Sequence, residues 1–194
     1  MAKYKEGDIC KQLIILSMWQ VERVKKEENM DYNKKKALFI DLDGTLIKTA
    51  SGNTFPISIN DYTFRNEVLD KIGKMFPKLE YVYIVTNQGG IPKYVSKEDF
   101  EAKLEGITVF VRFYLTALKV KVDSIYCDSV DKDNPMRKPN TGMLEHFWSK
   151  ELSKENAIMI GDASGKPGDF SDSDKKCAEN FGIDYIDVED LLKL

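Results

Sequence analysis

Two carboxylates stand two residues apart in the segment Asp41-Leu42-Asp43-Gly44-Thr45, directly after the apolar run Ala37-Leu38-Phe39-Ile40. Neighbouring carboxylates repel each other, and they do so more strongly where they are partly removed from water. A folded protein keeps such a pair where a cation binds it or where a reaction at a phosphate group uses it. Because Asp-Gly is also common in surface turns, this segment by itself leaves a plain turn open. Three further segments of the chain bear on this choice.

Polar residues also end two further apolar runs, and a lysine precedes a predicted helix. Thr86-Asn87-Gln88 end one run, Gly161-Asp162 end another, and Lys138 lies in a loop before a helix. The carboxyl ends of parallel strands meet at one edge of a sheet, where α/β proteins place their sites. We therefore expect these side chains to gather at one rim together with Asp41 and Asp43.

A phosphate monoester at this rim would meet the groups that its hydrolysis needs. We expect Asp41 and Asp162 to share a Mg²⁺, a hard cation that prefers carboxylate, phosphate and water oxygens. We expect Asp41 to attack phosphorus and form an aspartyl-phosphate. Asp43 would protonate the leaving oxygen and then deprotonate the hydrolytic water. Thr86 would bind a phosphoryl oxygen, and Lys138 would place a fixed positive charge beside the transferring group.

Short apolar segments alternate with helical patterns from residue 37 onward. The predicted strands cover residues 37–41, 81–86, 123–127, 157–161 and 184–186. The predicted helices cover residues 66–76, 97–118, 143–152 and 174–181, with a short one at the end of the chain. Strands that are apolar on both faces are typical of a parallel sheet covered by helices. We therefore predict an α/β, doubly wound, Rossmann-like parallel sheet of about five strands, with no large cap domain.

Composition sets further limits on the class of protein. The chain of 194 residues is long enough for one domain with a substantial core, which we assign to residues 34–194. Residues 1–33 form an N-terminal extension whose structure the sequence leaves open. The cysteines are odd in number and form no C-x-x-C, which favours a reducing compartment, the cytoplasm or the nucleus. The apolar run at residues 13–19 is too short to span a membrane, and we expect a monomer.

Together these segments resemble the haloacid dehalogenase-like (HAD-like) phosphatases, whose pattern is D-x-D-G-T, a Thr or Ser after a strand, a Lys, and G-D followed by another Asp. The resemblance implies Asp41 as nucleophile and Asp43 as acid/base. It also implies that Mg²⁺ is held by Asp41, by the backbone carbonyl of Asp43 and by Asp162. Asp169 and Asp174 both stand where a further acidic residue could support the metal site, and we assign Asp174. The alternative for Asp169 is a helix cap.

A closer resemblance is to the 3′-phosphatase domain of polynucleotide kinase/phosphatase, and it covers residues 34–194. Four segments carry it: Ser51-Gly52-Asn53-Thr54-Phe55-Pro56, Thr86-Asn87-Gln88-Gly89-Gly90-Ile91, Arg137-Lys138-Pro139-Asn140-Thr141-Gly142-Met143 and Gly161-Asp162-Ala163-Ser164-Gly165-Lys166-Pro167. The resemblance implies a polynucleotide 3′-phosphatase in nucleic-acid end repair, with DNA favoured over RNA. The predicted site comprises catalytic Asp41, Asp43, Thr86 and Lys138; substrate-binding Gly44, Asn87, Gln88 and Arg137; and metal-binding Asp41, Asp43, Asp162 and Asp174.

The chain departs from that family in two respects. The loop between Pro167 and Asp169 is much shorter than the basic loop expected there, and no G-x-x-x-x-G-K-[ST] occurs, so 5′ phosphorylation is not expected. The net charge of −3 gives no general attraction to nucleic acid. Binding must then depend on a few local cations, for which Arg137, Lys166 and the run Lys34-Lys35-Lys36 are candidates.

Two alternatives stay open. One is a capless phosphatase of the same superfamily that acts on a small phosphorylated metabolite, of the histidinol-phosphate or heptose-bisphosphate type. Those enzymes usually carry a zinc loop of several Cys and a His, whereas the interval from Cys127 to Lys138 holds one Cys and no His. The other is a catalytically inactive module that binds DNA ends, against which the intact acidic residues and Lys138 argue.

Overall fold

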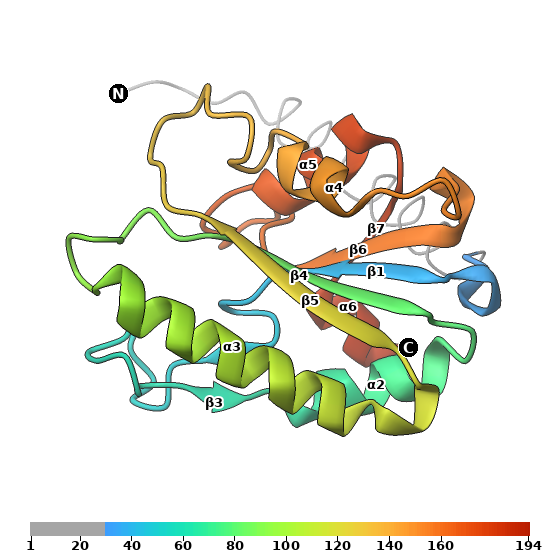
Figure 1. The fold of residues 1–194 in the computed structure, drawn as a ribbon, viewed down its shortest axis with the longest axis horizontal. Helices are drawn as coiled ribbons and strands as arrows, with labels where there is room; N and C mark the ends of the chain where they lie inside the picture. The colour runs from blue at the N-terminus through green and yellow to red at the C-terminus, as the bar shows by residue number, and fades with distance from the viewer. Residues whose placement is uncertain (1–29) are drawn as a thin grey trace, which may run out of the picture. The chain divides into compact units, whose positions relative to one another are not determined.

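Five parallel strands form the central sheet of the protein (Figure 1). The computed structural model describes residues 30–194. The strands are β1 (Ala37–Ile40), β4 (Tyr81–Asn87), β5 (Lys121–Cys127), β6 (Ala157–Gly161) and β7 (Asp184–Asp187). They lie in the order β5-β4-β1-β6-β7, and each neighbouring pair is parallel. The predicted doubly wound α/β fold is therefore confirmed.

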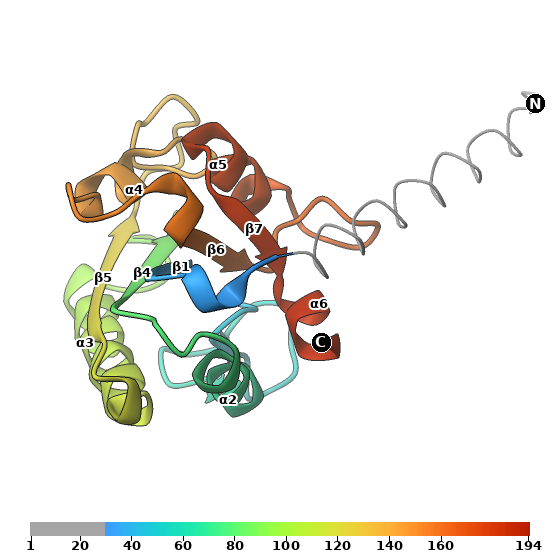
Figure 2. The ribbon, with the colours of Figure 1, turned by 90° about the vertical axis from the view of Figure 1, so that its right-hand side faces the viewer.

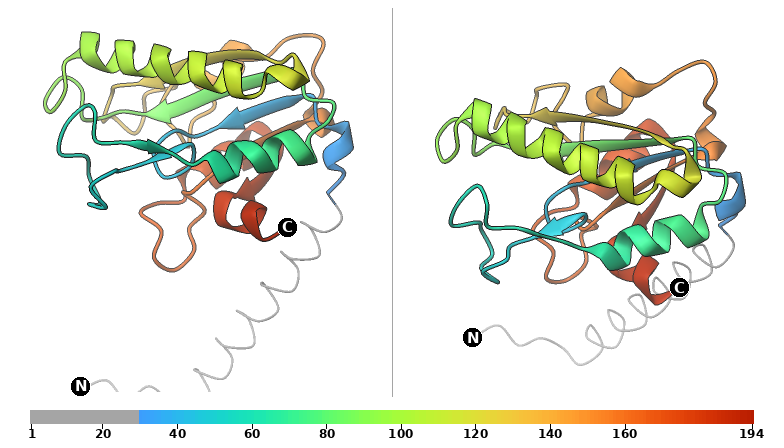
Figure 3. Two further views of the ribbon diagram at one scale, coloured as in Figure 1. Left: turned by 90° about the horizontal axis from the view of Figure 1, so that it is seen from below. Right: turned by 60° about the horizontal axis from the view of Figure 1, so that its bottom comes forward.

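Helices cover both faces of this sheet (Figure 2). On one face lie α2 (Asn66–Met75), α3 (Lys97–Tyr114) and α6 (Val188–Lys193), and on the other lie α4 (Gly142–Phe147) and α5 (Ser173–Phe181). Seen from below, α2 and α3 cross the same face of the sheet, with α6 beside α2 (Figure 3). Because both faces are covered, β1 and β6 are buried along their whole length, which explains their uninterrupted apolar sequence.

The long helix α3 follows directly from its sequence pattern. Its N-cap is Ser96, whose hydroxyl oxygen accepts a hydrogen bond of 3.0 Å from the backbone N–H of Asp99. Four of its predicted core side chains are buried: Phe100, Leu104, Ile107 and Val111. The helix ends at Tyr114, and a 3₁₀ turn over Thr116–Leu118 replaces its predicted last turn.

The helix predicted over residues 143–152 is shorter in the structure. It ends at Phe147, and Trp148 takes an extended conformation with φ −71° and ψ 125°. The Trp148 ring packs edge-on against Phe181, with ring centroids 4.9 Å apart, and Leu152 is buried. Tertiary packing of large side chains therefore overrides the local helical preference that the sequence pattern indicates.

Short elements connect the strands in the part of the chain that the structure describes. A small hairpin of β2 (Ile47–Lys48) and β3 (Thr63–Phe64) follows β1 and leads into α2. After β4 the chain passes through one loop into α3. No separate cap domain stands between these elements within residues 30–194, in agreement with the predicted fold.

Residues 1–29, and with them most of the predicted N-terminal extension 1–33, lie outside the described residues. The domain boundary at residue 34 therefore stays a prediction. Within residues 30–194, no helix is both long enough and apolar enough to cross a membrane. Cys127 and Cys177 are free and buried. The reducing compartment, cytoplasmic or nuclear, and the monomeric state also stay predictions.

Candidate active site

The sheet changes its winding direction between β1 and β6, which lie side by side at its centre. In doubly wound sheets, ligands bind beyond the carboxyl ends of the strands at this switch point. The chain leaves β1 into Asp41 and leaves β6 into Asp162, so both carboxylates stand at that point. The backbone N–H of Asp41 donates to the carbonyl of Ile160 at 3.0 Å, which extends the pairing of the two strands up to the site.

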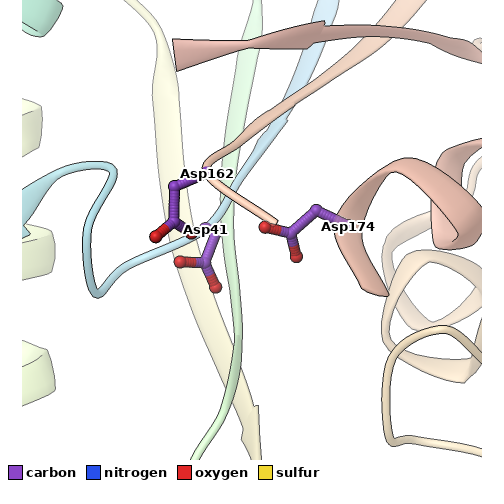
Figure 4. Close-up of side chains that lie close together, drawn as sticks. All are labelled: Asp41, Asp162 and Asp174. Atoms are coloured by element: carbon purple, nitrogen blue, oxygen red, sulfur yellow. The ribbon is translucent and has the colours of Figure 1, made fainter. Parts of the chain in front are cut away.

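Three carboxylates meet beyond these strand ends (Figure 4). Asp41, Asp162 and Asp174 each offer an oxygen, and the three oxygens lie within 4.8 Å of one another. Asp41 and Asp174 are buried, whereas Asp162 is exposed at the surface edge of the group. Asp174 reaches the group from the first turn of α5 because Gly161 has no side chain: a Cβ there would stand 2.2 Å from Asp174 Oδ2.

Lys138 supplies the positive charge of this group. Its Nζ lies 2.6 Å from Asp41 Oδ1, 2.6 Å from Asp174 Oδ1 and 2.8 Å from the carbonyl oxygen of Val85. The side chain of Asn87 fixes the Lys138 backbone, since its amide donates to the Lys138 carbonyl at 2.9 Å and its carbonyl accepts from the Lys138 N–H at 3.0 Å. These contacts hold a buried ammonium between two buried carboxylates.

The local electrostatics of the site indicate an excess of negative charge. Burial raises the pKa of the Asp41 carboxyl well above its usual range, with Lys138 opposing and Asp174 and Asp162 adding to the shift. Although Asp162 is exposed at one side, partial desolvation and the nearby Asp174 raise its pKa to about 6. Burial disfavours the charged form of Lys138, but its two carboxylate partners outweigh that effect and raise its pKa.

The donor set fits a hard divalent cation. Three carboxylates face a single ammonium, so the ionised group lacks positive charge, and all of its donors are carboxylate oxygens of the kind that Mg²⁺ binds. Asp43 lies outside the three-carboxylate group. The metal contact predicted for the backbone carbonyl of Asp43 stays a prediction.

Asp43 is joined to a second predicted residue of the site. The Gln88 side-chain amide donates to Asp43 Oδ2 at 2.6 Å and to Thr86 Oγ1 at 3.0 Å, so one side chain bridges the ends of β1 and β4. Asp43 is exposed, whereas Thr86 is buried near the end of β4. The structure thus brings these three predicted residues together, with Gln88 bound to the proposed acid/base group itself.

The other predicted substrate-binding residues make contacts within the protein. The Gly44 N–H donates to the Ile47 carbonyl at 2.8 Å, and both polar atoms of the Asn87 amide bind Lys138. The Arg137 guanidinium donates to the Ser129 carbonyl at 2.7 Å. These contacts position loops of the rim, and the predicted substrate contacts stay predictions.

Between Asp169 and Asp174, only Asp174 joins the three-carboxylate group. Asp169 Oδ2 instead accepts hydrogen bonds from Ser164 N, Ser164 Oγ and Lys166 N at 3.1, 2.7 and 3.0 Å. It therefore organises the loop after β6 and does not cap α5, whose N-cap position is Asp172.

Two of the lysines predicted to bind nucleic acid form ion pairs within the protein instead. The prediction for Lys35 is wrong, because this side chain is buried at 2% exposure, pairs with Asp184 and donates to the carbonyl oxygens of Glu155 and Ala157. Lys166 is paired with Asp187 and Asp190 near the start of α6. Ion pairs within the fold therefore engage both lysines, which the sequence suggested as contacts for nucleic acid.

Sequence reasoning missed two polar residues beside the site. Asp61 accepts hydrogen bonds from Ser51 and Ile57, and Arg65 donates to the carbonyl of Gly44 at 2.6 Å. Neither residue belongs to a spaced motif or ends an apolar run, so the sequence carries no signal for them. Asp61 and its partners lie within the loop between β2 and β3, whereas Arg65 reaches the loop after β1 only when the hairpin folds back against it.

The fold and the site together define a phosphatase of the haloacid dehalogenase-like class. The chain belongs to the polynucleotide kinase 3 phosphatase family, whose sequence model matches residues 35–191. This match covers nearly all of the part of the chain that carries the sheet and the carboxylate group.

The curated relatives of this chain are not all of one kind. A bifunctional polynucleotide phosphatase/kinase of Schizosaccharomyces pombe is 33% identical over 160 residues, which cover 78% of this chain and 36% of that protein. A histidine biosynthesis bifunctional protein of Legionella pneumophila is 30% identical over 168 residues, which cover 79% of this chain and 41% of that protein. The chain therefore spans less than half the length of either relative.

A solved structure resembles this fold. The D,D-heptose 1.7-bisphosphate phosphatase from B. bronchiseptica, complexed with magnesium and phosphate, matches with a TM-score of 0.57 at 18% sequence identity. The match covers 77% of this chain and 78% of that chain. At this identity the likeness concerns the fold alone.

Proposed function

We propose that this chain is a Mg²⁺-dependent phosphomonoesterase that removes the 3′-phosphate from nucleic-acid ends through an aspartyl-phosphate on Asp41. The observation that carries the chemistry is the buried contact of Lys138 with Asp41 and Asp174, beside Asp162 at the switch point of the sheet. The family match and the S. pombe relative support the choice of substrate.

The residues of the chain divide the reaction between them. Lys138 holds Asp41 through Oδ1, so that the carboxylate is oriented toward phosphorus. An Asp41 oxygen attacks phosphorus, and the bond from phosphorus to the sugar 3′-oxygen breaks. Asp43 gives that oxygen its proton and later takes a proton from the water that attacks phosphorus, which releases phosphate and restores Asp41.

The metal has a limited and specific part in this proposal. Asp41, Asp162 and the backbone carbonyl of Asp43 would hold Mg²⁺, with Asp174 supporting the group through Lys138. When bound, Mg²⁺ neutralises phosphate charge and acts as a Lewis acid. The raised pKa of Asp41 fits this view, because a nearby cation would restore the ionised form that attack requires.

Exposed apolar side chains around the rim support a substrate with flat, apolar faces. Among the described residues, several of the most exposed large apolar side chains lie in the loops at the carboxyl end of the sheet: Phe55, Ile57, Tyr94, Val130 and Phe170. Phe55 and Phe170 come from different loops and meet edge to face, with ring centroids 6.5 Å apart. Aromatic side chains at a rim favour stacking with nucleobases, which small sugar phosphates lack.

A second candidate function is hydrolysis of a small phosphorylated metabolite. The relative from histidine biosynthesis and the heptose-bisphosphate phosphatase structure favour it. Within residues 30–194 the interval from Cys127 to Lys138 lacks the Cys/His set expected of such enzymes, and Cys127 is buried. This difference supports the nucleic-acid substrate.

The deciding experiment compares four substrates with the full chain and Mg²⁺. They are a 3′-phosphorylated deoxyoligonucleotide, the same sequence phosphorylated at its 5′ end, its RNA counterpart with a 3′-phosphate, and a small phosphorylated metabolite, either histidinol phosphate or a heptose bisphosphate. We expect the highest kcat/KM for the 3′-phosphorylated DNA strand. A higher kcat/KM for histidinol phosphate or a heptose bisphosphate would establish the second candidate instead.

A further inference from the structure

Arg65 lies directly before α2 and is almost completely buried, at 8% exposure. Its guanidinium reaches three other residues. Nη1 donates to the Gly44 carbonyl at 2.6 Å, Nη2 pairs with Glu189 Oε1 at 2.7 Å, and Nε pairs with Glu67 Oε1 at 3.3 Å. Its backbone N–H donates to the Leu46 carbonyl at 2.9 Å. Both ends of the turn from residue 44 to 46 are therefore bound to a single residue.

Gly44 has little freedom to move within the site. Its φ of +83° lies in the left-handed region, and a Cβ at this position would stand 2.1 Å from Asp162 Oδ2. The backbone that directly follows Asp43 is thus packed against one of the three clustered carboxylates. The hydrogen bond from Arg65 fixes the direction of the Gly44 carbonyl, one peptide beyond Asp43.

We propose that Arg65 is a positioning residue for Asp43, acting through the Gly44 carbonyl. This inference rests on the acid/base role that the proposed function gives Asp43. A guanidinium bound to a carbonyl in a buried place makes a charge-assisted hydrogen bond, stronger than one between neutral groups. The Asp43 carboxylate itself is exposed and is bound by Gln88 at its tip. Its placement therefore depends on the backbone that Arg65 holds.

The identity of the leaving group separates this role from a general structural one. A sugar oxygen is a poor leaving group and needs a proton from Asp43, whereas p-nitrophenolate leaves without one. Misplacing Asp43 should therefore slow the transfer of phosphate to Asp41, which kcat/KM reports, much more for alkyl phosphates than for p-nitrophenyl phosphate. A variant that merely loosens the fold should slow both reactions to the same extent.

The experiment measures kcat/KM for Arg65→Ala and Arg65→Lys on three substrates: a 3′-phosphorylated oligonucleotide, glycerol 2-phosphate and p-nitrophenyl phosphate. Asp43→Asn serves as the benchmark, with an expected loss on the order of 10²–10⁴-fold on the two alkyl phosphates. For Arg65→Ala we expect a loss about tenfold larger, or more, on the alkyl phosphates than on p-nitrophenyl phosphate. Arg65→Lys should show a smaller difference of the same kind between the two classes of substrate. Added guanidinium should partly restore the activity of Arg65→Ala on alkyl phosphates.

Glu189→Gln is the matched control, since it weakens the pairing of Arg65 with α6 and leaves the bond to Gly44 in place. Any loss of activity in Glu189→Gln should be the same on alkyl phosphates and on p-nitrophenyl phosphate. Equal losses of activity on all substrates for both Arg65 variants would overturn the proposal. So would a difference between alkyl phosphates and p-nitrophenyl phosphate in Glu189→Gln as large as the difference in Arg65→Ala. If Arg65→Ala fails to fold, Arg65→Lys decides by the same criterion.

The outcome for Arg65 and the outcome for the proposed function can be told apart. Hydrolysis of glycerol 2-phosphate without hydrolysis of the oligonucleotide would reject the nucleic-acid substrate, and the leaving-group comparison would still report on Arg65. If Asp43→Asn shows no dependence on the leaving group, the acid/base role fails and the inference for Arg65 fails with it.

Discussion

The ammonium of Lys138 lies 2.6 Å from Asp41 Oδ1, and both side chains are buried, at 2% and 9% exposure. Because a buried carboxylate without a partner is strongly disfavoured, this contact opposes the effect of burial on the proposed nucleophile and holds its side chain in place. The same ammonium also lies 2.6 Å from Asp174 Oδ1. Lys138 is therefore expected to matter for stability as well as for turnover.

Lys138→Met should destabilise the metal-free protein by about 3–5 kcal/mol, because it leaves two buried carboxylates without a cation. Urea denaturation in EDTA at neutral pH measures this change. Lys97→Met is the control: that exposed lysine lies 3.8 Å from Glu101, and its loss should cost less than about 0.5 kcal/mol. Adding Asp174→Asn to Lys138→Met should recover part of the lost stability. A cost for Lys138→Met no larger than that of the control would contradict the expectation.

Asp41→Asn should abolish turnover and leave the fold intact, because an amide oxygen does not form the phosphoryl intermediate. The measurement is phosphate release, with circular dichroism to check the fold. Asp123→Asn, a change at an exposed position of β5, should leave activity unchanged. Turnover by Asp41→Asn in buffer with excess Mg²⁺ would show that Asp41 is not the nucleophile.

Gly44→Ala should be destabilising for two separable reasons. Its φ of +83° is unfavourable for alanine, and the new Cβ would stand 2.1 Å from Asp162 Oδ2. Gly182→Ala is the matched control, because Gly182 has a φ of +79° with nothing within 4 Å of its Cβ position. The control should cost about 1–2 kcal/mol from backbone strain. Gly44→Ala should cost clearly more and should also lower activity; equal costs would contradict the close approach.

Asp61 should make the stability of the loop at residues 51–57 depend on pH. Its carboxylate accepts hydrogen bonds from the Ile57 N–H, the Ser51 hydroxyl and the Ser51 N–H, and these bonds lower its pKa below the ordinary 3.8. The pKa of Asp61 is lower in the folded protein than in the unfolded one. The stability that its hydrogen bonds give the loop is therefore present above about pH 4 and is lost as the pH falls through the lowered pKa.

Hydrogen exchange of the Ser51 and Ile57 amides measures this effect. Their protection factors should stay constant from about pH 7 to about pH 4 and fall below that. Asp61→Asn should lose the protection throughout, whereas Asp70→Asn, a change on the exposed side of α2, should keep it. Protection that already declines near pH 6 in the unchanged protein would count against Asp61 as its source.

Phe55→Ala and Phe170→Ala should weaken binding of oligonucleotides selectively. Stacking of a base on an aromatic side chain contributes about 1–3 kcal/mol, which corresponds to a rise in KM of about 5- to 150-fold. Hydrolysis of p-nitrophenyl phosphate should be unaffected. Phe113→Ala, which removes an equally exposed ring from α3, is the control. Oligonucleotide KM values that match those of the unchanged protein would reject a stacking role for this pair.

The sequence determined the fold and the position of the site to a large extent. Asp41 and Asp162 could be placed at one rim because each directly follows an apolar strand, and parallel strands end at the same edge. The apolar spacing in α3 likewise indicated its buried face. Such signals are local: they depend on residues a few positions apart, whose geometry the strand and helix repeats fix.

Only the tertiary structure decided which polar groups pair with one another. Lys138 and Asp41 are 97 positions apart, and no periodicity relates them. The choice of Asp174 over Asp169 depends on how closely α5 approaches Gly161. Lys35, an apparent surface cation, is instead buried against Asp184. Pairing of charges over long separations follows from the packing of whole elements, and packing is specified by the complete set of core side chains rather than by any short motif.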